Sequence, residues 1–202
     1  MQALLPILIA AVMGLGHAFE PDHLLAVSQL VARRDTTWLA VKDGLYWGLG
    51  HSTMLVICGG LVLLGKATVV ASTYFEVLVG LVLVVMGTGR LLNRQNYTLP
   101  TMAARSRHQL AYAIGLLHGL AGSGALVVLV LSEQRSPLLM LAYIVLFGLG
   151  SVVGMFGAAA LMNIPFTPRM RLSRLLTSSV VVVTSLLSIA YGGWMVVQWM
   201  SG

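Results

Sequence analysis

The sequence has few charged residues and one cysteine. Asp, Glu, Lys and Arg make up 9% of the 202 residues, whereas soluble domains contain about 25%. A single cysteine excludes an internal disulfide and a cysteine metal cluster, so Cys58 is predicted to be a small apolar residue of a helix. Hydrophobic residues make up 58% of the chain, and the mean hydropathy is +0.91. This composition predicts an integral membrane protein whose surroundings are a lipid bilayer.

Two kinds of catalytic motif are also missing. The chain has no H-E-x-x-H motif of zinc proteases and is predicted not to be an enzyme. It also has no P-loop, so ATP binding by this chain is not expected to drive transport. The net charge of +6 is explained by basic loops, which carry topology information in membrane proteins, and no nucleic acid is expected as a partner.

Apolar runs long enough to cross a bilayer occur six times. The predicted spans cover residues 3–31, 38–64, 67–92, 109–131, 137–163 and 175–200. The N-terminal run has no basic residue before it, so it is not interpreted as a cleavable signal peptide. We therefore expect an all-α protein with one transmembrane domain, residues 1–202, and no separate soluble domain.

Basic residues gather in the odd-numbered loops. Ten of the twelve Lys and Arg residues belong to these loops: Arg33, Arg34, Lys42, Arg90, Arg94, Arg105, Arg107, Arg169, Arg171 and Arg174. The even loops hold only Lys66 and Arg135. The positive-inside rule then places the odd loops in the cytoplasm and both termini outside it, in a multi-pass protein of the inner or plasma membrane.

The chain contains two weakly similar halves. The stretch GLGH at 14–17 is matched by GLLH at 115–118, and the Gly-Leu-Gly at 48–50 is matched by another at 148–150. Both matches fall in the same order and at nearly the same separation. Residues 1–94 and 108–202 are therefore predicted to be two three-helix repeats. Because three spans is an odd number, the second repeat enters from the opposite side, as in many transporters that bind substrate between inverted repeats.

A polar cluster interrupts the first span. The segment GHAFEPDH (16–23) contains two histidines, two acids and a proline. Pro21 has no N–H and is predicted to break the helix, which lets His17, Asp22 and His23 approach one another. Irregular backbone at membrane depth is tolerated where it lines a cavity or is buried in protein. The alternative is a kinked helix whose polar side chains satisfy one another.

Histidines at mid-membrane depth come from three different spans. His17, His51 and His118 lie at similar distances from their span ends, beside Asp22 and His23. A lone membrane histidine commonly joins helices by a hydrogen bond. Three at one depth, with a carboxylate, instead indicate a site for a metal ion, because neutral imidazole suits nickel, copper, zinc and iron. We expect no permanently bound cofactor.

Other polar residues are weaker candidates. Glu20, Ser52, Glu76 and Ser123 are predicted to line the ion pathway, although Glu20 and Glu76 can also be hydrated interfacial charges. His108, at the start of the fourth span, is predicted to be an interfacial residue.

These motifs resemble a known family. HAFEPDH fits the H-x4-D-H signature of the nickel/cobalt transporters, LGHST (49–53) is similar to their second motif, and HGLAGSGAL (118–126) is similar to the six-span UreH-type branch, described as urease accessory membrane proteins. The resemblance implies nickel or cobalt as the substrate, selected by the signature residues His17, Asp22 and His23. The chain differs from larger members in lacking two spans and in having Glu20-Pro21 where Asp-Ala is common.

The sequence also bears on functions other than transport of a metal. A thiol–disulfide relay needs cysteines in the first and fourth spans, where this chain has histidines. Two alternatives remain: an exporter of sulfite or an organosulfonate, served by helix N-termini facing a cavity, and an assembly factor that delivers metal to a metalloenzyme and its maturation proteins.

Overall fold

The computed structural model describes residues 4–32, 34, 36–64, 74–92, 107–133, 137–167 and 174–201, and these residues form helices and short connections. The α-helices are α1 (Leu4–His17), α2 (Pro21–Val31), α3 (Thr37–Leu63), α5 (Tyr74–Leu92), α6 (Arg107–Glu133), α7 (Pro137–Asn163) and α8 (Arg174–Ser201), and the 3-10 helix η1 (Ile164–Phe166) follows α7. The described residues contain no strand, as the all-α prediction required.

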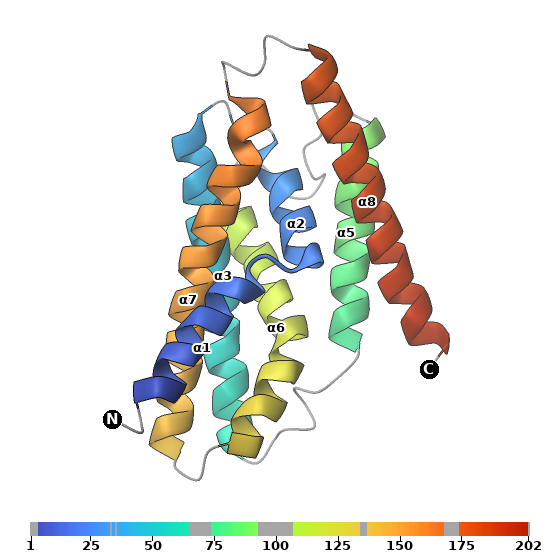
Figure 1. Cartoon of the computed structure of the whole chain (residues 1–202). Helices are drawn as coiled ribbons and strands as arrows, with labels where there is room; N and C mark the ends of the chain where they lie inside the picture. Colours follow the sequence, from blue (N-terminus) through green and yellow to red (C-terminus); the bar gives the residue numbers. More distant parts are fainter. Residues whose placement is uncertain are drawn as a thin grey trace.

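The helices run along one long axis and alternate in direction (Figure 1). α1 and α2 ascend together in this view, α3, α6 and α8 descend, and α5 and α7 ascend, so both termini lie at the lower end. α3 packs against α6 and α7, α1 packs against α7, and α5 pairs with α8. α2 lies between these two groups and contacts α3, α5, α7 and α8.

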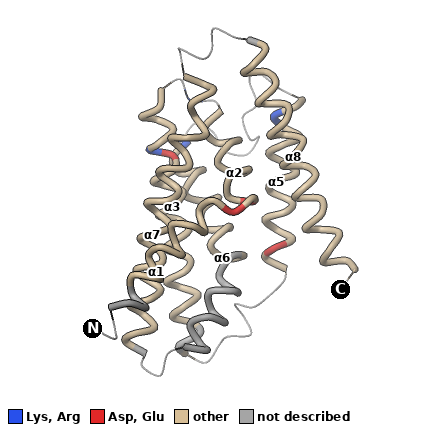
Figure 2. The backbone as a smooth tube through the Cα atoms, in the orientation of Figure 1, with Lys and Arg blue, Asp and Glu red and all other residues tan. Residues whose placement is uncertain are grey.

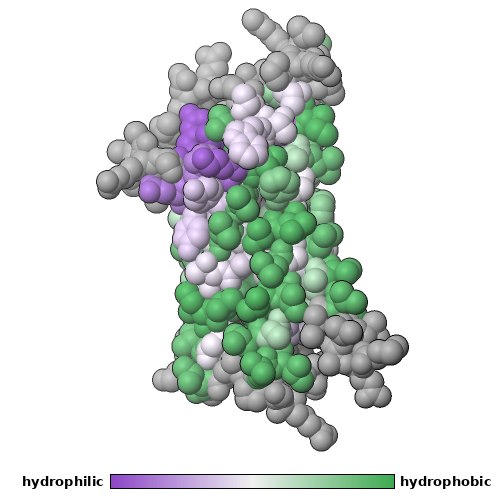
Figure 3. All heavy atoms as spheres, turned by 90° about the vertical axis from the view of Figure 1, so that its left-hand side faces the viewer, coloured by the Kyte–Doolittle hydropathy of each residue, from purple (hydrophilic) through white to green (hydrophobic). Residues whose placement is uncertain are grey.

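Three of the described helices are long and apolar enough to cross a membrane: Tyr74–Leu92, Leu138–Phe166 and Leu175–Ser201. α3 and α6 each have 27 residues and are therefore about 40 Å long at 1.5 Å per residue, and both contain ionisable side chains, among them Asp43 and His51 in α3 and His118 in α6. Green apolar residues cover the middle of the face in Figure 3, and purple hydrophilic residues gather toward its upper end. The described residues therefore include three clearly apolar helices that could span a membrane, which indicates a membrane protein.

The predicted break in the first span is present. α1 ends at His17 and α2 begins at Pro21, midway along the molecule in Figure 1. Glu20 precedes α2 with extended backbone angles (φ −63°, ψ 151°), and Pro21 occupies the first turn, where its missing N–H removes no helical bond. The amide of Glu20 donates to the carbonyl of His17 at 3.1 Å. The break therefore leaves that carbonyl satisfied and turns the chain between two short helices.

Glycines let α1 and α7 cross closely. A Cβ atom added to Gly14 would lie 2.0 Å from the carbonyl oxygen of Phe147. One added to Gly150 would lie 2.1 Å from the carbonyl oxygen of Ala11. Small residues at such crossings allow backbones to touch, which is how helices associate in lipid.

α3 and α6 cross in the same manner. An added Cβ on Gly115 would lie 2.1 Å from the carbonyl oxygen of Trp47, and one on Gly50 would lie 2.1 Å from that of Tyr112. In both crossings a glycine of each helix meets the partner's backbone, so larger side chains would force the helices apart.

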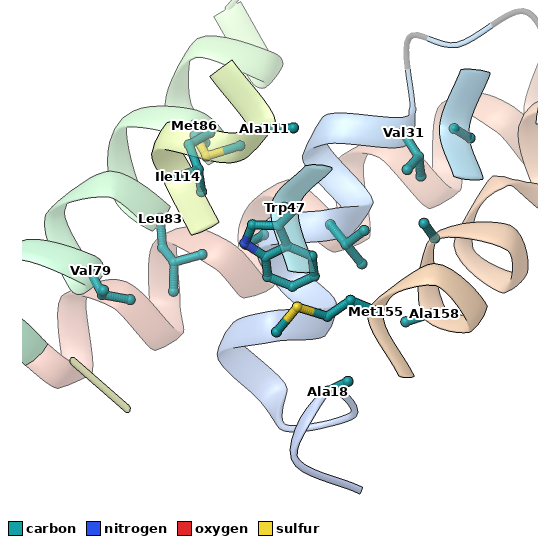
Figure 4. Packing of buried hydrophobic residues seen from close by; sticks show 14 residues of the cluster. Ala18, Val31, Trp47, Val79, Leu83, Met86, Ala111, Ile114, Met155 and Ala158 are labelled. Carbon is teal, nitrogen blue, oxygen red and sulfur yellow. The ribbon is translucent and has the colours of Figure 1, made fainter. Parts of the chain in front are cut away.

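The main hydrophobic cluster lies around α2. Trp47 of α3 is fully buried between the helices, and Met155 of α7 lies beside it in Figure 4. Ala18, at the break, and Val31, at the end of α2, belong to the same cluster. Both ends of α2 are therefore packed against the rest of the molecule.

Polar side chains from other helices also hold the end of α2. Asn163 of α7 donates to the carbonyl of Val31 at 3.1 Å, and Arg90 of α5 donates to the carbonyl of Ala32 at 3.2 Å. The last carbonyls of a helix have no partner within it, so these bonds satisfy groups that would otherwise be buried alone.

Candidate functional site

The break between α1 and α2 brings two histidines together. His17 is the last residue of α1 and His23 lies in the first turn of α2, and their ring centroids are 4.5 Å apart. His17 Nδ1 donates to Glu20 Oε1 at 2.8 Å, and His23 Nδ1 donates to Asp22 Oδ1 at 3.1 Å. Each acid of the motif therefore orients one imidazole.

α3 adds a third histidine to this pair. The ring centroid of His51 is 5.2 Å from that of His17 and 5.2 Å from that of His23. One nitrogen from each of the three rings lies within 4.8 Å of the others, a separation that could hold a metal ion. His51 is completely buried, and neither of its ring nitrogens has a hydrogen-bond partner in the described part of the chain. Buried polar groups are usually hydrogen-bonded in proteins, and a bound ligand would satisfy these two nitrogens.

His118 of α6 joins the cluster through His23. The two ring centroids are 5.4 Å apart, and His118 is buried. Its Nδ1 donates to the carbonyl of Ile114 at 3.0 Å, which directs Nε2 away from its own helix backbone. His118 is outside the group formed by His17, His23 and His51, so it lies next to that group and not within it.

Three of these histidines share one hydrogen-bonding arrangement. In His17, His23 and His118, Nδ1 is bonded to an oxygen, and Nε2 is buried with no partner among the described residues. Histidines that ligate metals almost always donate the other ring N–H to a carboxylate or a backbone carbonyl, which fixes the tautomer that exposes the ligand nitrogen. The hydrogen bonds of this cluster match that requirement.

Two aromatic side chains border the histidines. The ring of Phe147 is 5.4 Å from His17, while that of Trp47 is 5.4 Å from His23 and 5.8 Å from His118. Both aromatic residues are buried. The imidazoles therefore lie between apolar rings contributed by α3 and α7.

The acidic side of the cluster is the accessible one. The side chain of Glu20 is 53% exposed and that of Asp22 is 19% exposed, whereas that of His23 is 1% exposed. Glu20, Asp22 and His23 form a second group of ligand atoms within 4.8 Å of one another. Red marks these acids at the start of α2 in Figure 2, midway along the molecule. The carboxylates are therefore more exposed than the imidazole of His23.

The structure does not gather every predicted pathway residue at the cluster. Ser52 turns its hydroxyl to α7, where Oγ donates to the carbonyl of Gly148 at 2.8 Å. Glu76 is exposed in the first turn of α5 and belongs to neither group of ligand atoms among the described residues. Ser123 lies in α6, but its side chain is outside the described residues.

His108, predicted to be an interfacial residue, takes part in a hydrogen-bonded cluster with an acid of α3. His108 Nδ1 is 2.7 Å from Asp43 Oδ1, and Arg34 Nε and Nη2 both donate to the same carboxylate. Tyr46 stacks on His108 with an interplanar angle of 17°. The signal that sequence reasoning overlooked is Asp43 itself, an acid six residues inside the predicted second span.

Comparison with known proteins identifies relatives. The chain is 33% identical over 196 residues to "Urease accessory protein UreH" of Bacillus sp. (strain TB-90), covering 90% of this chain and 86% of that protein. The chain belongs to the UreH-type branch of the nickel/cobalt transporter family. No model of a protein family and no solved structure matches it.

Two more distant relatives are similar over part of their length. "Cobalt transport protein NhlF" of Rhodococcus rhodochrous is 32% identical over 112 residues, which cover 43% of this chain and 30% of that protein. "Chloroplast protein FOR GROWTH AND FERTILITY 1" of Arabidopsis thaliana is 28% identical over 157 residues, 67% of this chain and 43% of that protein. The names of the urease accessory and cobalt transport proteins are not those of enzymes, which agrees with the prediction that this member of the family is not one.

Proposed function

We propose that this protein is a six-span carrier that moves a divalent transition metal, nickel or cobalt, through a mid-membrane site of histidine and aspartate. The observation that carries the proposal is the set of buried Nε2 atoms on His17, His23 and His118 that have no partner among the described residues, with His51 beside them. A urease accessory protein and a cobalt transport protein among the relatives support a role in nickel or cobalt handling.

We further propose that the two halves are inverted repeats. In the motif register, Gly14 corresponds to Gly115, and Phe147 corresponds to Trp47. Gly14 meets the backbone of Phe147, and Gly115 meets the backbone of Trp47, at nearly equal distances. Gly150 with Ala11 and Gly50 with Tyr112 form a second corresponding pair of contacts. Equivalent contacts between α1 and α7 and between α3 and α6 are what a twofold axis relating the halves would produce.

The helix directions support the orientation proposed from the charge count. The described Lys and Arg residues are blue only at the upper end in Figure 2, and both termini lie at the lower end in Figure 1. The upper end is then cytoplasmic by the positive-inside rule. A reporter fused after Gly202 should accordingly lie outside the cytoplasm, and one inserted near Thr98 should lie inside it. A cytoplasmic reporter after Gly202 would contradict both the six spans and the inverted repeat.

At the proposed site, the ion exchanges part of its water shell for protein ligands. His17, His23 and His51 supply neutral imidazole nitrogens, and His118 lies close enough to His23 to take over one position. Asp22 orients His23 and offsets part of the charge of the ion. Since Ser151 stands at the position in α7 that corresponds to His51, the ligand set is incomplete on one side, which favours release. The chain has no P-loop, so a gradient or a partner protein supplies the driving force.

Uptake into proteoliposomes tests the proposal. Purified protein would be reconstituted, and accumulation of nickel, cobalt, zinc and sulfite would be compared. We expect saturable nickel or cobalt uptake that Asp22→Asn abolishes, with Val56→Ala, an exposed position in α3 outside the motifs, as the control. Transport of sulfite without transport of either metal would contradict the proposal and favour the anion exporter.

The name of the Bacillus relative favours a second candidate, a factor that delivers metal to a metalloenzyme. Such a factor would bind nickel at the same histidines without moving it across the bilayer. Nickel binding by detergent-solubilised protein, combined with no uptake into proteoliposomes, would favour this candidate over the carrier.

A further inference from the structure

A buried charge cluster joins three segments near the upper end of the molecule. We name Arg34, Asp43 and His108 the charge cluster; they come from the residues after α2, from α3 and from α6. Both oxygens of Asp43 are bonded, since Arg34 donates to each and His108 lies 2.7 Å from Oδ1. Asp43 is 2% exposed and Arg34 is 8% exposed. A buried ion pair is weak support for stability, because apolar side chains of similar size often do as well.

The charge cluster lies directly along the helices that carry the site. On α3, Asp43 precedes His51 by eight residues, or about 12 Å of helix, and on α6, His108 precedes His118 by ten residues, or about 15 Å. Trp47 lies between Asp43 and His51 on α3, and its ring touches His23 and His118. Trp47 and then the charge cluster therefore lie between the imidazoles and the upper end of the molecule.

The corresponding positions toward the lower end are apolar. Phe147 corresponds to Trp47 and packs on His17, and Tyr143 corresponds to Asp43. Tyr143 and Phe147 belong to a buried apolar cluster with Ala10 and Leu55, and the Tyr143 hydroxyl lies 3.8 Å from Met13 Sδ. The two sides of the site thus differ, since one carries buried charges that can be hydrated when separated and the other carries none in these positions.

We propose that Trp47 and the charge cluster form a gate that closes the path between the histidine site and the upper end of the molecule. Opening would part α3 from α6, and water would then replace the bonds among Arg34, Asp43 and His108. Separated charges regain hydration, whereas a separated apolar contact only loses burial, so a charged gate can open at a smaller cost. This inference rests on the proposed function, in which the site must face each side in turn.

Thiol labelling of a buried reporter tests the gate. Ala111 of α6 lies one turn beyond His108 and is completely buried, and Ala10 of α1, its counterpart in the motif register, is also completely buried. Each would be replaced by cysteine in a Cys58→Ser background, and the rate of modification by a water-soluble maleimide would be measured on the reconstituted full chain without metal. Ala111→Cys reports on the proposed gate, and Ala10→Cys reports on the opposite end.

The double variant Arg34→Gln/Asp43→Asn removes both charges together, so it leaves no unpaired buried charge of the kind that would unfold the protein in Asp43→Asn alone. We expect the double variant to lower the labelling rate at position 111 at least about ten-fold while leaving the rate at position 10 unchanged, because neutral side chains gain less hydration than charges when the gate opens. An unchanged or raised rate at position 111 would overturn the proposal. Equal changes at both positions would also overturn it, because they would show a general effect on the protein.

The labelling result can be separated from the proposed function. The reporter assay contains no nickel, and uptake of nickel is measured on the protein with wild-type charges. A failure of uptake, together with a fall in labelling at position 111 alone in the double variant, would reject the carrier function and keep the gate. Normal uptake without that selective fall in labelling would reject the gate and keep the carrier.

Discussion

α3 and α7 have the same length, 27 residues each, and each crosses a neighbouring helix through glycines, but they differ in what they offer to the site. His51 of α3 is buried with both ring nitrogens lacking a partner in the described part of the chain. Ser151, its counterpart in the Gly-Leu-Gly register, donates to the carbonyls of Gly14 and Phe147 at 3.1 and 3.0 Å. α3 therefore places an imidazole without a hydrogen-bond partner at the site, whereas the Ser151 hydroxyl of α7 is already hydrogen-bonded to backbone carbonyls.

This difference shows how similar packing can serve two purposes. The glycines that bring α1 against α7 also occur where α3 meets α6, so helix packing is similar in both places. The chemistry is concentrated at the break in the first span, where His17 and His23 meet His51, and α6 contributes His118. An ion would then be held mainly by side chains of the first half of the chain, His17, His23 and His51, with His118 from the second half.

The largest effect is expected from the residues at the break. Asp22→Asn and His23→Ala should each lower metal accumulation by more than about 100-fold, because loss of a residue that only orients a ligand already costs about 10- to 100-fold. Cellular nickel or cobalt content, corrected for the amount of protein in the membrane, provides the measurement. Wild-type accumulation in both variants would show that the break does not hold the ion.

The comparison of α3 with α7 can be tested by paired substitutions. His51→Ala should weaken metal binding about 10- to 100-fold, whereas Ser151→Ala should leave binding unchanged, because Ser151 faces backbone carbonyls. Isothermal titration of nickel into the purified proteins measures both affinities. Equal losses in the two variants would mean that α7 also contributes to the site.

The similarity of the two crossings can be tested with alanine. Gly14→Ala and Gly115→Ala should each destabilise the protein by about 1–3 kcal/mol, since the new Cβ would overlap a backbone oxygen. Gly157→Ala is the matched control, because nothing lies within 4 Å of its added Cβ, and a helical alanine is favoured by about 0.8–1.0 kcal/mol over glycine. Thermal unfolding in detergent measures the changes, and a large loss at Gly157 would contradict this packing.

The smallest effect is expected at the exposed acid. Glu20→Gln should reduce the initial rate of uptake only about two- to five-fold, because a half-exposed charge is screened by water and salt. The difference from wild type should shrink as the salt concentration rises. A reduction that is independent of salt would indicate that Glu20 binds the ion directly and does not attract it from solution.

Much of the architecture was predictable from local patterns. Pro21 has no N–H and so predicted the helix break, and the apolar runs predicted α5, α7 and α8 as membrane helices. The predicted third span began at residue 67, whereas α5 begins at Tyr74, and residues 67–73 lie outside the described residues. The repeat and the full set of six spans stay predictions.

The candidate site was predictable where its residues are close in sequence. His17, Asp22 and His23 share one motif, so their proximity followed from the break. The separate role of Asp43 was not predictable, because its partners Arg34 and His108 stand in segments that the apolar pattern assigned to loops and interfaces. Ser52 was expected at the pathway, but a backbone carbonyl of α7 accepts its hydroxyl hydrogen instead.

The sequence by itself determined that this chain lies in a membrane and that its first helix breaks at Pro21. It also determined that the polar residues of the HAFEPDH motif lie at this break. These properties follow from hydropathy and from covalent structure, which act within a few residues. Only the tertiary structure decided which nitrogen of each histidine is left without a partner and that Trp47 and Phe147 border the imidazoles. It also decided that Asp43 joins Arg34 to His108, because such contacts depend on how helices distant in sequence pack together.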